Sequence, residues 1–436
     1  MTVLYAMMHL LVDGICAFAM LGKFCVKHQN YAYFLIYNFC AFALQFPIGL
    51  LLDTWNHSRK NKYSCWIFAF VGFCMTVLGA FTNPFILGLG NAFFHVGAGV
   101  ESIETDRIKG WKGRGLGFFV APGAVGLLLG RFLANTGFAR QKILCFFVIG
   151  VVLICLCFVD VYKKKDGNSV AFANPQMAIS TFWNKQNMLF VFVIFFIVVV
   201  RTYVGFMTDF HWNKTTISAA AVVFIVFIGK LSGGFLSAKW GDTKTLFGLL
   251  LWTPILLTLG EYWFLGLSGL LLVNMTMPVT LHLLCEKVPY FPGSAFGFLT
   301  VAIFVGFLPV YYRLNQRDGY DVFLMFALSF FITLSVEFLV AILFGIRTKR
   351  GLLLVFLMNL LTNPMAVFIH LCGMTLLPFW NTWCQVGMEV GVLILEAFIY
   401  VLFSRKDDFH IKKPILLATV ANVTSFGCGL FINYLK

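Results

Sequence analysis

Apolar runs of about 18 to 25 residues recur along the whole chain and are separated by shorter polar stretches. Runs of this length cross a bilayer as helices, because a backbone surrounded by lipid has to satisfy its own hydrogen bonds. We therefore expect an all-α polytopic membrane protein with about 15 spans. The expected spans are 1–26, 31–53, 64–82, 84–103, 115–135, 143–161, 188–208, 216–237, 245–261, 263–285, 294–312, 321–346, 351–377, 382–403 and 414–434.

Composition agrees with this class of protein. The chain is 60% hydrophobic and only 11% of its 436 residues are charged, whereas a soluble chain carries roughly a quarter. The first apolar run has no basic residue before it and no small-residue cleavage site, so it is predicted to be a retained helix. The 12 cysteines occur singly, without a CxxC pair, which predicts neither a disulfide framework nor a metal site. No cofactor is expected.

The net charge of +14 is distributed as membrane topology predicts. With the N-terminus in the cytoplasm, Lys and Arg are concentrated in the inner loops, such as YKKKDG and SRKDDFHIKK. Topology and attraction to anionic lipid explain the charge better than nucleic-acid binding does. The expected partners are the lipid bilayer and a small-molecule substrate, with no nucleic acid and a monomeric chain favoured.

The longest polar interruption divides the chain. Residues 163–187 are predicted to be a cytoplasmic linker between two six-helix bundles, 1–162 and 188–347, and residues 348–436 to be an additional three-helix membrane tail. The two bundles read as a repeat at an offset of about 180 residues, with Gly117 matching Gly297 and Asn91 matching Asn274. Transporters with two parallel halves hold their substrate near the midplane between the halves.

The stretches after the second and eighth spans carry a signature. GLLLDTWNHSRK contains Gly49, Asp53, Arg59 and Lys60, and GFLSAKWGDTK contains Gly234, Lys239 and Gly241. These resemble the gating-loop signature G-x-x-x-D-R-x-G-R-R of the major facilitator superfamily, although TWNHS replaces its centre and Ala238 replaces the acid of the second copy. The resemblance covers residues 1 to about 347. It implies twelve helices in two bundles, alternating access and a gating role for these residues.

A closer resemblance is carried by LGNAFFHVGAG in the fourth span. This run is similar to bacterial members of the superfamily related to fosmidomycin-resistance efflux proteins. The likeness favours export over uptake. Because no organelle signal is visible in the sequence, the cytoplasmic, or inner, membrane of a bacterium is the expected location.

Ionisable side chains within a span are costly in lipid and usually face the interior of the protein. His9 and Asp13 share a helix face, and a carboxylate beside an imidazole can hold a proton. Asp13 and Arg201 occupy matching positions in the first and seventh spans. They are expected to form a breakable pair, or Arg201 to hold an anionic substrate; the alternative is a permanent structural pair. Lys230 lies near the end of a span, where it can extend its amine to the membrane surface.

Polar positions on other spans complete the set of candidates for substrate binding or proton coupling. Gly88, Asn91, His95, Gly99 and Ser102 form one inward stripe, with His95 either a site residue or a structural histidine. The following charges, residues 101–107, are expected to be mainly solvated, with some latching onto the Asp53 loop. The remaining candidates are Asn38 and Gln45 on the second span, Asn274 and His282 on the tenth span, and Glu337.

Missing motifs limit the possible functions. The chain contains no phosphate-binding G-x-x-x-x-G-K-[ST] loop, no HExxH and no G-x-S-x-G motif, which argues against an ATP-driven pump and against an enzyme. The prediction is a proton-coupled secondary active transporter of a small organic solute. The alternative is a non-transporting sensor or scaffold on a transporter fold, and a lipid-modifying enzyme ranks last.

Overall fold

The structure is a computed structural model. It describes residues 1–25, 31–59, 62–137, 139–163, 185–207, 210–213, 215–315, 322–348, 382–404 and 413–434, together with scattered positions between 351 and 366. The chain divides into two compact units, Met1–Val310 and Tyr311–Lys436, and each is described by itself. All regular structure in the described residues is helical.

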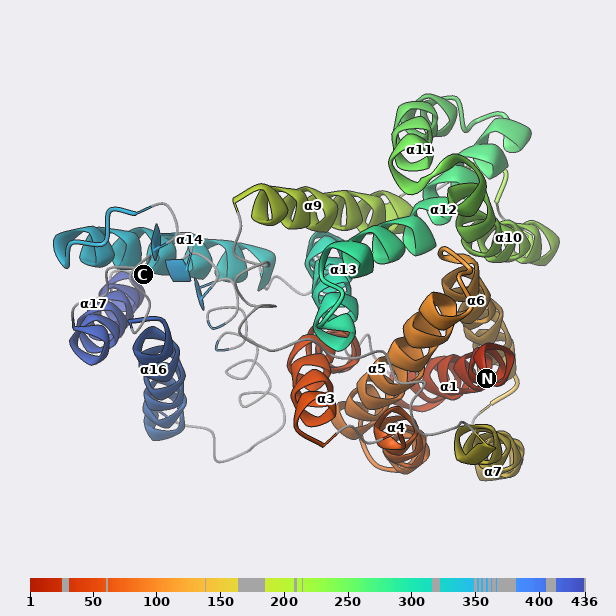
Figure 1. The fold of residues 1–436 in the computed structure, drawn as a ribbon, viewed down its shortest axis with the longest axis horizontal. Helices are drawn as coiled ribbons and strands as arrows, with labels where there is room; N and C mark the ends of the chain where they lie inside the picture. The colour runs from red at the N-terminus through yellow and green to blue at the C-terminus, as the bar shows by residue number, and fades with distance from the viewer. Residues whose placement is uncertain are drawn as a thin grey trace. The chain divides into compact units, whose positions relative to one another are not determined.

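Unit 1 is a helical assembly in which the second span is broken into short segments (Figure 1). Its helices are α1 (Thr2–Ala19), α2 (Tyr31–Asn38), α3 (Gln45–Arg59), α4 (Ser64–Phe81), α5 (Pro84–Ile108), α6 (Arg114–Asn135), α7 (Arg140–Lys163), α9 (Lys185–Met207), α10 (Thr216–Trp240), α11 (Asp242–Thr258), α12 (Trp263–Lys287) and α13 (Pro292–Asn315). Two π-helical turns, Met20–Phe24 and Phe39–Ala43, follow α1 and α2.

Unit 2 contains the end of the chain. Its described helices are α14 (Val322–Leu343), α16 (Thr382–Ser404) and α17 (Pro414–Tyr434). Of the fifteen spans expected from the sequence, all but 351–377 coincide with a described helix or pair of helices, and 351–377 lies largely outside the described residues. Nine helices among the described residues are long and apolar enough to cross a membrane. The all-α, multi-pass membrane architecture is therefore confirmed.

Small residues bring the first helices of unit 1 into close contact. A Cβ atom on Gly72 of α4 would lie 2.1 Å from the backbone nitrogen of Phe94 in α5, so only glycine fits at this crossing. Gly126 of α6 packs equally closely on Leu10 of α1. Such contacts let membrane helices associate through backbone packing, and the core between them is filled by Tyr5, Met8 and Phe18.

Two buried aspartates bind the beginnings of other helices. Asp53 of α3 is fully buried and accepts hydrogen bonds from the backbone nitrogens of Gly293 (2.9 Å) and Ser294 (2.7 Å) at the start of α13. Asp106 of α5 accepts from the backbone nitrogens of Gly113 and Gly115 at the start of α6, both at 2.7 Å. A carboxylate there satisfies amides that have no partner within their own helix.

The gating-loop prediction needs correction in its secondary structure. Helix α3 continues to Arg59, so Gly49 and Asp53 lie in a helix and not in a loop. The helix can include Asp53 because its carboxylate is hydrogen-bonded inside the protein and needs no solvent. Gly234 and Lys239 likewise lie within α10, and Gly241 marks its end with a φ of 84°. Lys60 lies outside the described residues.

The two signature glycines make matching contacts. Gly49 of α3 packs against the backbone of Gly293. A Cβ atom added to Gly49 would lie 2.1 Å from the carbonyl oxygen of Gly293. Gly234 of α10 packs against the backbone of Gly113. A Cβ atom added to Gly234 would lie 2.3 Å from the carbonyl oxygen of Gly113. Helix α3 therefore packs against the start of α13, and α10 packs against the start of α6.

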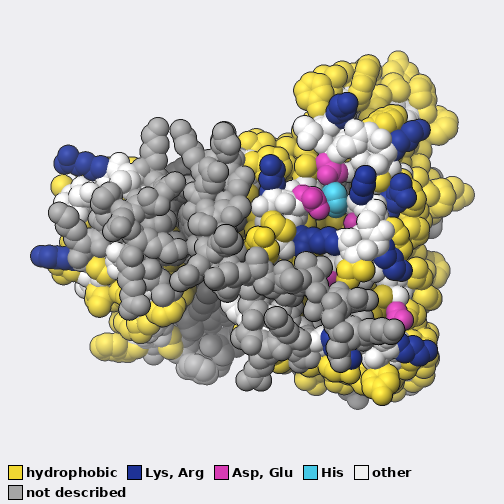
Figure 2. Space-filling view, in the orientation of Figure 1, with side chains coloured by type: hydrophobic (Ala, Val, Ile, Leu, Met, Phe, Trp, Pro, Cys, Tyr) yellow, Lys and Arg dark blue, Asp and Glu magenta, His cyan; other side chains and the backbone are white. Residues whose placement is uncertain are grey.

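Charged side chains, among them Arg107, Asp242 and His282, gather where several helices of unit 1 end, and this region is called the charged end of unit 1 below. Figure 2 shows them over the region where α6, α10 and α12 meet, between apolar margins. There Arg107 of α5 donates to the backbone oxygens of Cys285 (2.6 Å) and Pro289 (2.7 Å). The prediction that residues 101–107 are mainly solvated was wrong, because they belong to α5 and Glu101, Glu104 and Asp106 are buried.

Candidate functional site

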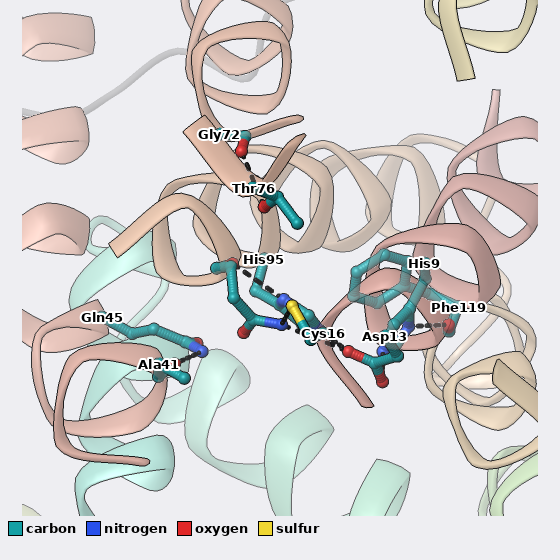
Figure 3. Close-up of polar contacts among 10 residues, drawn as sticks. His9, Asp13, Cys16, Ala41, Gln45, Gly72, Thr76, His95 and Phe119 are labelled. Carbon is teal, nitrogen blue, oxygen red and sulfur yellow. Dashed lines mark hydrogen bonds and ion pairs between the residues drawn. The ribbon is translucent and has the colours of Figure 1, made fainter. Parts of the chain in front are cut away.

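Two side chains of α1 form the middle of the candidate site. His9 and Asp13 lie one helical turn apart, and Nε2 of His9 is 3.1 Å from Oδ2 of Asp13. His9 is buried and Asp13 is 14% exposed, so the pair is largely removed from solvent. Nδ1 of His9 lies 2.7 Å from the backbone oxygen of Phe119 in α6, which fixes the orientation of the ring (Figure 3).

Helix α5 brings a second imidazole to the same carboxylate. Nε2 of His95 is 3.7 Å from Oδ1 of Asp13, and its Nδ1 lies 2.9 Å from the backbone oxygen of Asn91. The side-chain nitrogen of Asn91 donates to Oδ1 of Asp13 at 3.3 Å and to Sγ of Cys16 at 3.5 Å. The two imidazole rings meet edge to face, with centroids 4.5 Å apart. His9, Asp13 and His95 are called the Asp13 centre below.

The hydrogen bonds define which nitrogen of each imidazole carries its proton. A backbone oxygen only accepts, so Nδ1 of both His9 and His95 must be the donor. In the neutral rings Nε2 is then a lone pair that faces a carboxylate oxygen of Asp13. Two acceptors at these distances repel each other unless a cation lies between them. A proton or a metal ion placed between these atoms would remove the repulsion within the Asp13 centre.

Helix α6 closes the centre on a third side. A Cβ atom on Gly123 would lie 2.4 Å from Nε2 of His9 and 2.6 Å from Oδ2 of Asp13, so glycine leaves the space that these two atoms need. The adjacent Pro122 lies inside α6 and has no amide proton, so it donates no helix hydrogen bond to the backbone oxygen of Phe118. The sequence APGAVG thus shapes the centre.

Two basic residues lie near the centre. Lys230 of α10 is half-buried and within electrostatic range of both Asp13 and Arg201. Arg201 of α9 is half-buried, and its Nη1 atom is buried without a hydrogen-bond partner. Asp13 is paired with the two histidines and Asn91, so the structure contains no permanent pair between Asp13 and Arg201. A pair that forms in another conformation stays a prediction.

The sequence marked Lys230 as an ionisable residue within a span, but it did not predict where Lys230 or Gly123 would lie. Lys230 was expected to reach the membrane surface, but α10, which packs on α6, brings it within electrostatic range of Asp13 in α1. Its position inside an apolar run was a signal, because an ammonium group is costly in lipid. Gly123 was visible only as part of APGAVG, and its role depends on a contact between distant segments.

Other predicted site residues lie apart from the centre. Asn38 and Gln45 donate to backbone oxygens of their own helical segment, at Phe34 and Ala41. Asn274 likewise donates to Leu270, one turn before it in α12. His282 lies at the charged end of unit 1, with Nδ1 2.8 Å from Oδ2 of Asp242 and Nε2 3.9 Å from Glu286.

Glu337 belongs to a separate polar cluster in unit 2. It is buried and accepts a hydrogen bond from Asn359 at 2.8 Å. Nearby in the fold, buried Glu396 accepts from Thr362 and Asn422, both at 2.7 Å. These contacts hold α14, α16, α17 and the described positions near residue 360 together. The sequence left Glu337 as either a proton site or the partner of a basic residue, and in the structure its hydrogen-bond partner is the amide of Asn359.

Comparisons with known proteins find similarity among solved structures. No protein-family model and no curated protein sequence matches the chain. Among solved structures, it is similar to a variant of the E. coli fucose:proton symporter FucP, with a TM-score of 0.48 and 13% identity, covering 73% of this chain and 92% of that one. It is also similar to FucP in the outward conformation, a major facilitator superfamily transporter, with a TM-score of 0.46 and 13% identity over 72% and 93% of the chains.

This similarity is one of overall fold, and the name FucP describes that protein alone. The function proposed below rests on the residues of this chain.

Proposed function

We propose that this protein is a secondary active transporter that moves a small organic anion by alternating access, coupled to protons bound at the Asp13 centre. The observation that carries the proposal is Arg201, a guanidinium with a buried Nη1 atom that has no partner among the described residues. A buried cation without a partner is costly, and a carboxylate of a solute would supply the missing hydrogen bonds.

Coupling follows from the charges that surround this position. Lys230 interacts with Arg201 by repulsion and with Asp13 by attraction, so it links the proposed anion site to the Asp13 centre. A proton that binds between Asp13 and its histidines weakens the hold of Asp13 on Lys230. Lys230 is then available to a bound anion, which makes proton and solute binding mutually favourable.

The proposed orientation and direction follow from the sequence. The N-terminus is placed in the cytoplasm, the chain in the cytoplasmic membrane of a bacterium as a monomer, and the direction of transport is export. No catalytic role is proposed. The charged end of unit 1 that contains Arg107 and His282 then faces the cytoplasm.

Flux into and out of proteoliposomes tests the proposal. Wild-type protein is reconstituted with a pH gradient and offered lactate, succinate, citrate and benzoate as labelled probes. We expect gradient-driven flux of at least one probe, its loss in Arg201→Gln, and its retention in Arg131→Gln, which removes an exposed charge from the end of α6. Flux in Arg201→Gln equal to that of wild type would remove the proposed anion site.

A second candidate function is favoured by the division of the chain. Residues 311–436 form their own compact unit, as a module for a partner protein would. A non-transporting sensor or scaffold would lose its partner when residues 348–436 are deleted and would show no flux in either form. A transporter would show gradient-driven flux in at least one of the two forms, the full chain or the truncated chain.

A further inference from the structure

We propose that His9, Asp13 and His95 form a binding site for a divalent transition-metal ion of the Zn²⁺ type. The site shares the Asp13 centre with the proposed proton coupling, but metal binding does not require that the chain transports anything. No sequence motif indicates this site, because its three residues come from two helices and the cysteines are isolated.

The donor atoms have the spacing that a metal ion needs. One ligand atom from each of the three residues lies within 4.8 Å of the others, with separations of 3.1 Å from His9 to Asp13 and 3.7 Å from His95 to Asp13. Two ligands of a tetrahedral Zn²⁺ ion, each bonded at about 2.0–2.2 Å, are roughly 3.4 Å apart. Small side-chain rotations are sufficient to bring all three onto one ion.

The outer hydrogen bonds are also those of a metal site. In such sites a histidine binds the ion through one ring nitrogen and donates the other N–H to a backbone oxygen or a carboxylate. His9 and His95 both donate Nδ1–H to backbone oxygens, of Phe119 and Asn91, and turn the Nε2 lone pairs toward Asp13. Two imidazole nitrogens and one carboxylate are a donor set that suits zinc and its neighbours among the transition metals.

The surroundings leave room for the ion and offer a fourth ligand. Gly123 has no side chain to fill the volume beside His9 and Asp13. The amide of Asn91 joins Asp13 to the thiol of Cys16, which lies one turn along α1 on the same side. A water molecule or the Cys16 thiolate can therefore complete a four-coordinate site.

Lys230 opposes metal binding. Its ammonium group is within electrostatic range of Asp13, so a dication at the centre is repelled by it. This charge is expected to lower the affinity and not to abolish the site, since among the described residues the carboxylate of Asp13 is bonded to His9, His95 and Asn91 and not to Lys230. Removing the charge without shortening the side chain should strengthen metal binding.

Metal binding by the purified full chain tests the proposal. Chelator-treated protein in detergent is titrated with Co²⁺, whose visible spectrum reports coordination, and with Zn²⁺ in equilibrium dialysis. We expect one saturable class of sites in wild type, at least about 10-fold weaker binding in Asp13→Asn and in His95→Gln, and tighter binding in Lys230→Met. His282→Gln is the matched control, because His282 also pairs with an aspartate, Asp242, but has no second histidine.

The outcomes separate this inference from the transport proposal. If His282→Gln weakens binding as much as His95→Gln does, or if wild type binds no more metal than Asp13→Asn, the site does not exist, whatever the flux assays give. Thermal unfolding of each metal-free variant shows whether it is folded. Arg201→Gln, which is expected to lose flux, should bind metal like wild type, because Arg201 makes no contact with the three ligands.

Discussion

Gly123 of α6 lies so close to His9 of α1 that a single added carbon would reach Nε2 of the imidazole, at 2.4 Å. The histidine cannot retreat freely, since its other nitrogen is bonded to the Phe119 oxygen of the same helix α6. One helix therefore both anchors the ring and leaves the space in front of it. The geometry of the Asp13 centre depends on the register between α1 and α6.

Gly123→Ala is expected to disrupt the centre while the protein remains folded. The methyl group would push Nε2 of His9 away from Oδ2 of Asp13. Both atoms lie at the ends of side chains, which can move while the backbone stays in place. We expect loss of Co²⁺ binding and of gradient-driven flux. Gly248→Ala in α11 is the control, because a Cβ atom there meets nothing within 4 Å. Metal binding and flux in Gly123→Ala equal to those of Gly248→Ala would contradict this role for Gly123.

Asp53→Ala is expected to destabilise unit 1. The substitution leaves the buried backbone nitrogens of Gly293 and Ser294 without their acceptor, which costs about 1–3 kcal/mol. Thermal unfolding of the purified protein measures the effect. In Asp160→Ala, by contrast, the lost partner is the N-terminal amine and the carboxylate is 45% exposed, so the expected cost is below about 1 kcal/mol. Equal losses in the two variants would show that the bonds of Asp53 add no more than a surface pair does.

Arg107→Ala is expected to open the charged end of unit 1. The guanidinium ties the end of α5 to the backbone oxygens of Cys285 and Pro289, and its removal leaves these two oxygens with no donor from α5. Cys285 is 2% exposed, so its labelling by a water-soluble maleimide reports opening. In a chain whose other cysteines are replaced by serine or alanine, we expect faster labelling in Arg107→Ala than in Arg131→Ala. Slow labelling in both would mean that other contacts keep this end closed.

The sequence predicted the helices well and their contacts only in part. Apolar run length alone placed nearly every span, because the lipid requirement for internal hydrogen bonding leaves few alternatives. The spacing of His9 and Asp13 placed them on one face of α1, and the stripe containing Asn91 and His95 correctly suggested an inward surface of α5. That these two surfaces share one carboxylate depends on the α1–α5 packing, which no local pattern encodes.

Other features left no signal in the sequence. The π-helical turn Phe39–Ala43 lies between Asn38 and Gln45 and changes the register on which their shared face was predicted, since a π turn has no residue signature of its own. Asp53 was predicted to act in a loop because the family signature suggests one, whereas its partners are 240 and 241 residues away in the chain. Lys230 likewise comes within electrostatic range of Asp13 only through the packing of segments that are far apart in the chain.

The polar cluster of unit 2 gives a final prediction. Glu396 is 1% exposed and its two oxygens accept from different segments, Oε1 from Thr362 and Oε2 from Asn422. Glu396→Ala removes the shared acceptor and creates a cavity between these segments, so we expect unit 2 to lose stability by about 1–3 kcal/mol. Both donors also reach a backbone oxygen of their own segment, which limits the loss.

Limited proteolysis of purified full-length protein measures this loss, because cleavage within residues 311–436 should accelerate when unit 2 opens. Glu389→Ala is the control: Glu389 lies seven residues earlier on α16, is half-buried, and has no hydrogen bond among the described residues. We expect cleavage of that variant at the wild-type rate and faster cleavage of Glu396→Ala. If metal binding at the Asp13 centre is unchanged in Glu396→Ala, the carboxylate of Glu396 stabilises unit 2 and takes no part in the chemistry of unit 1. Equal cleavage of the two variants would instead mean that packing, and not the hydrogen bonds to Glu396, stabilises unit 2.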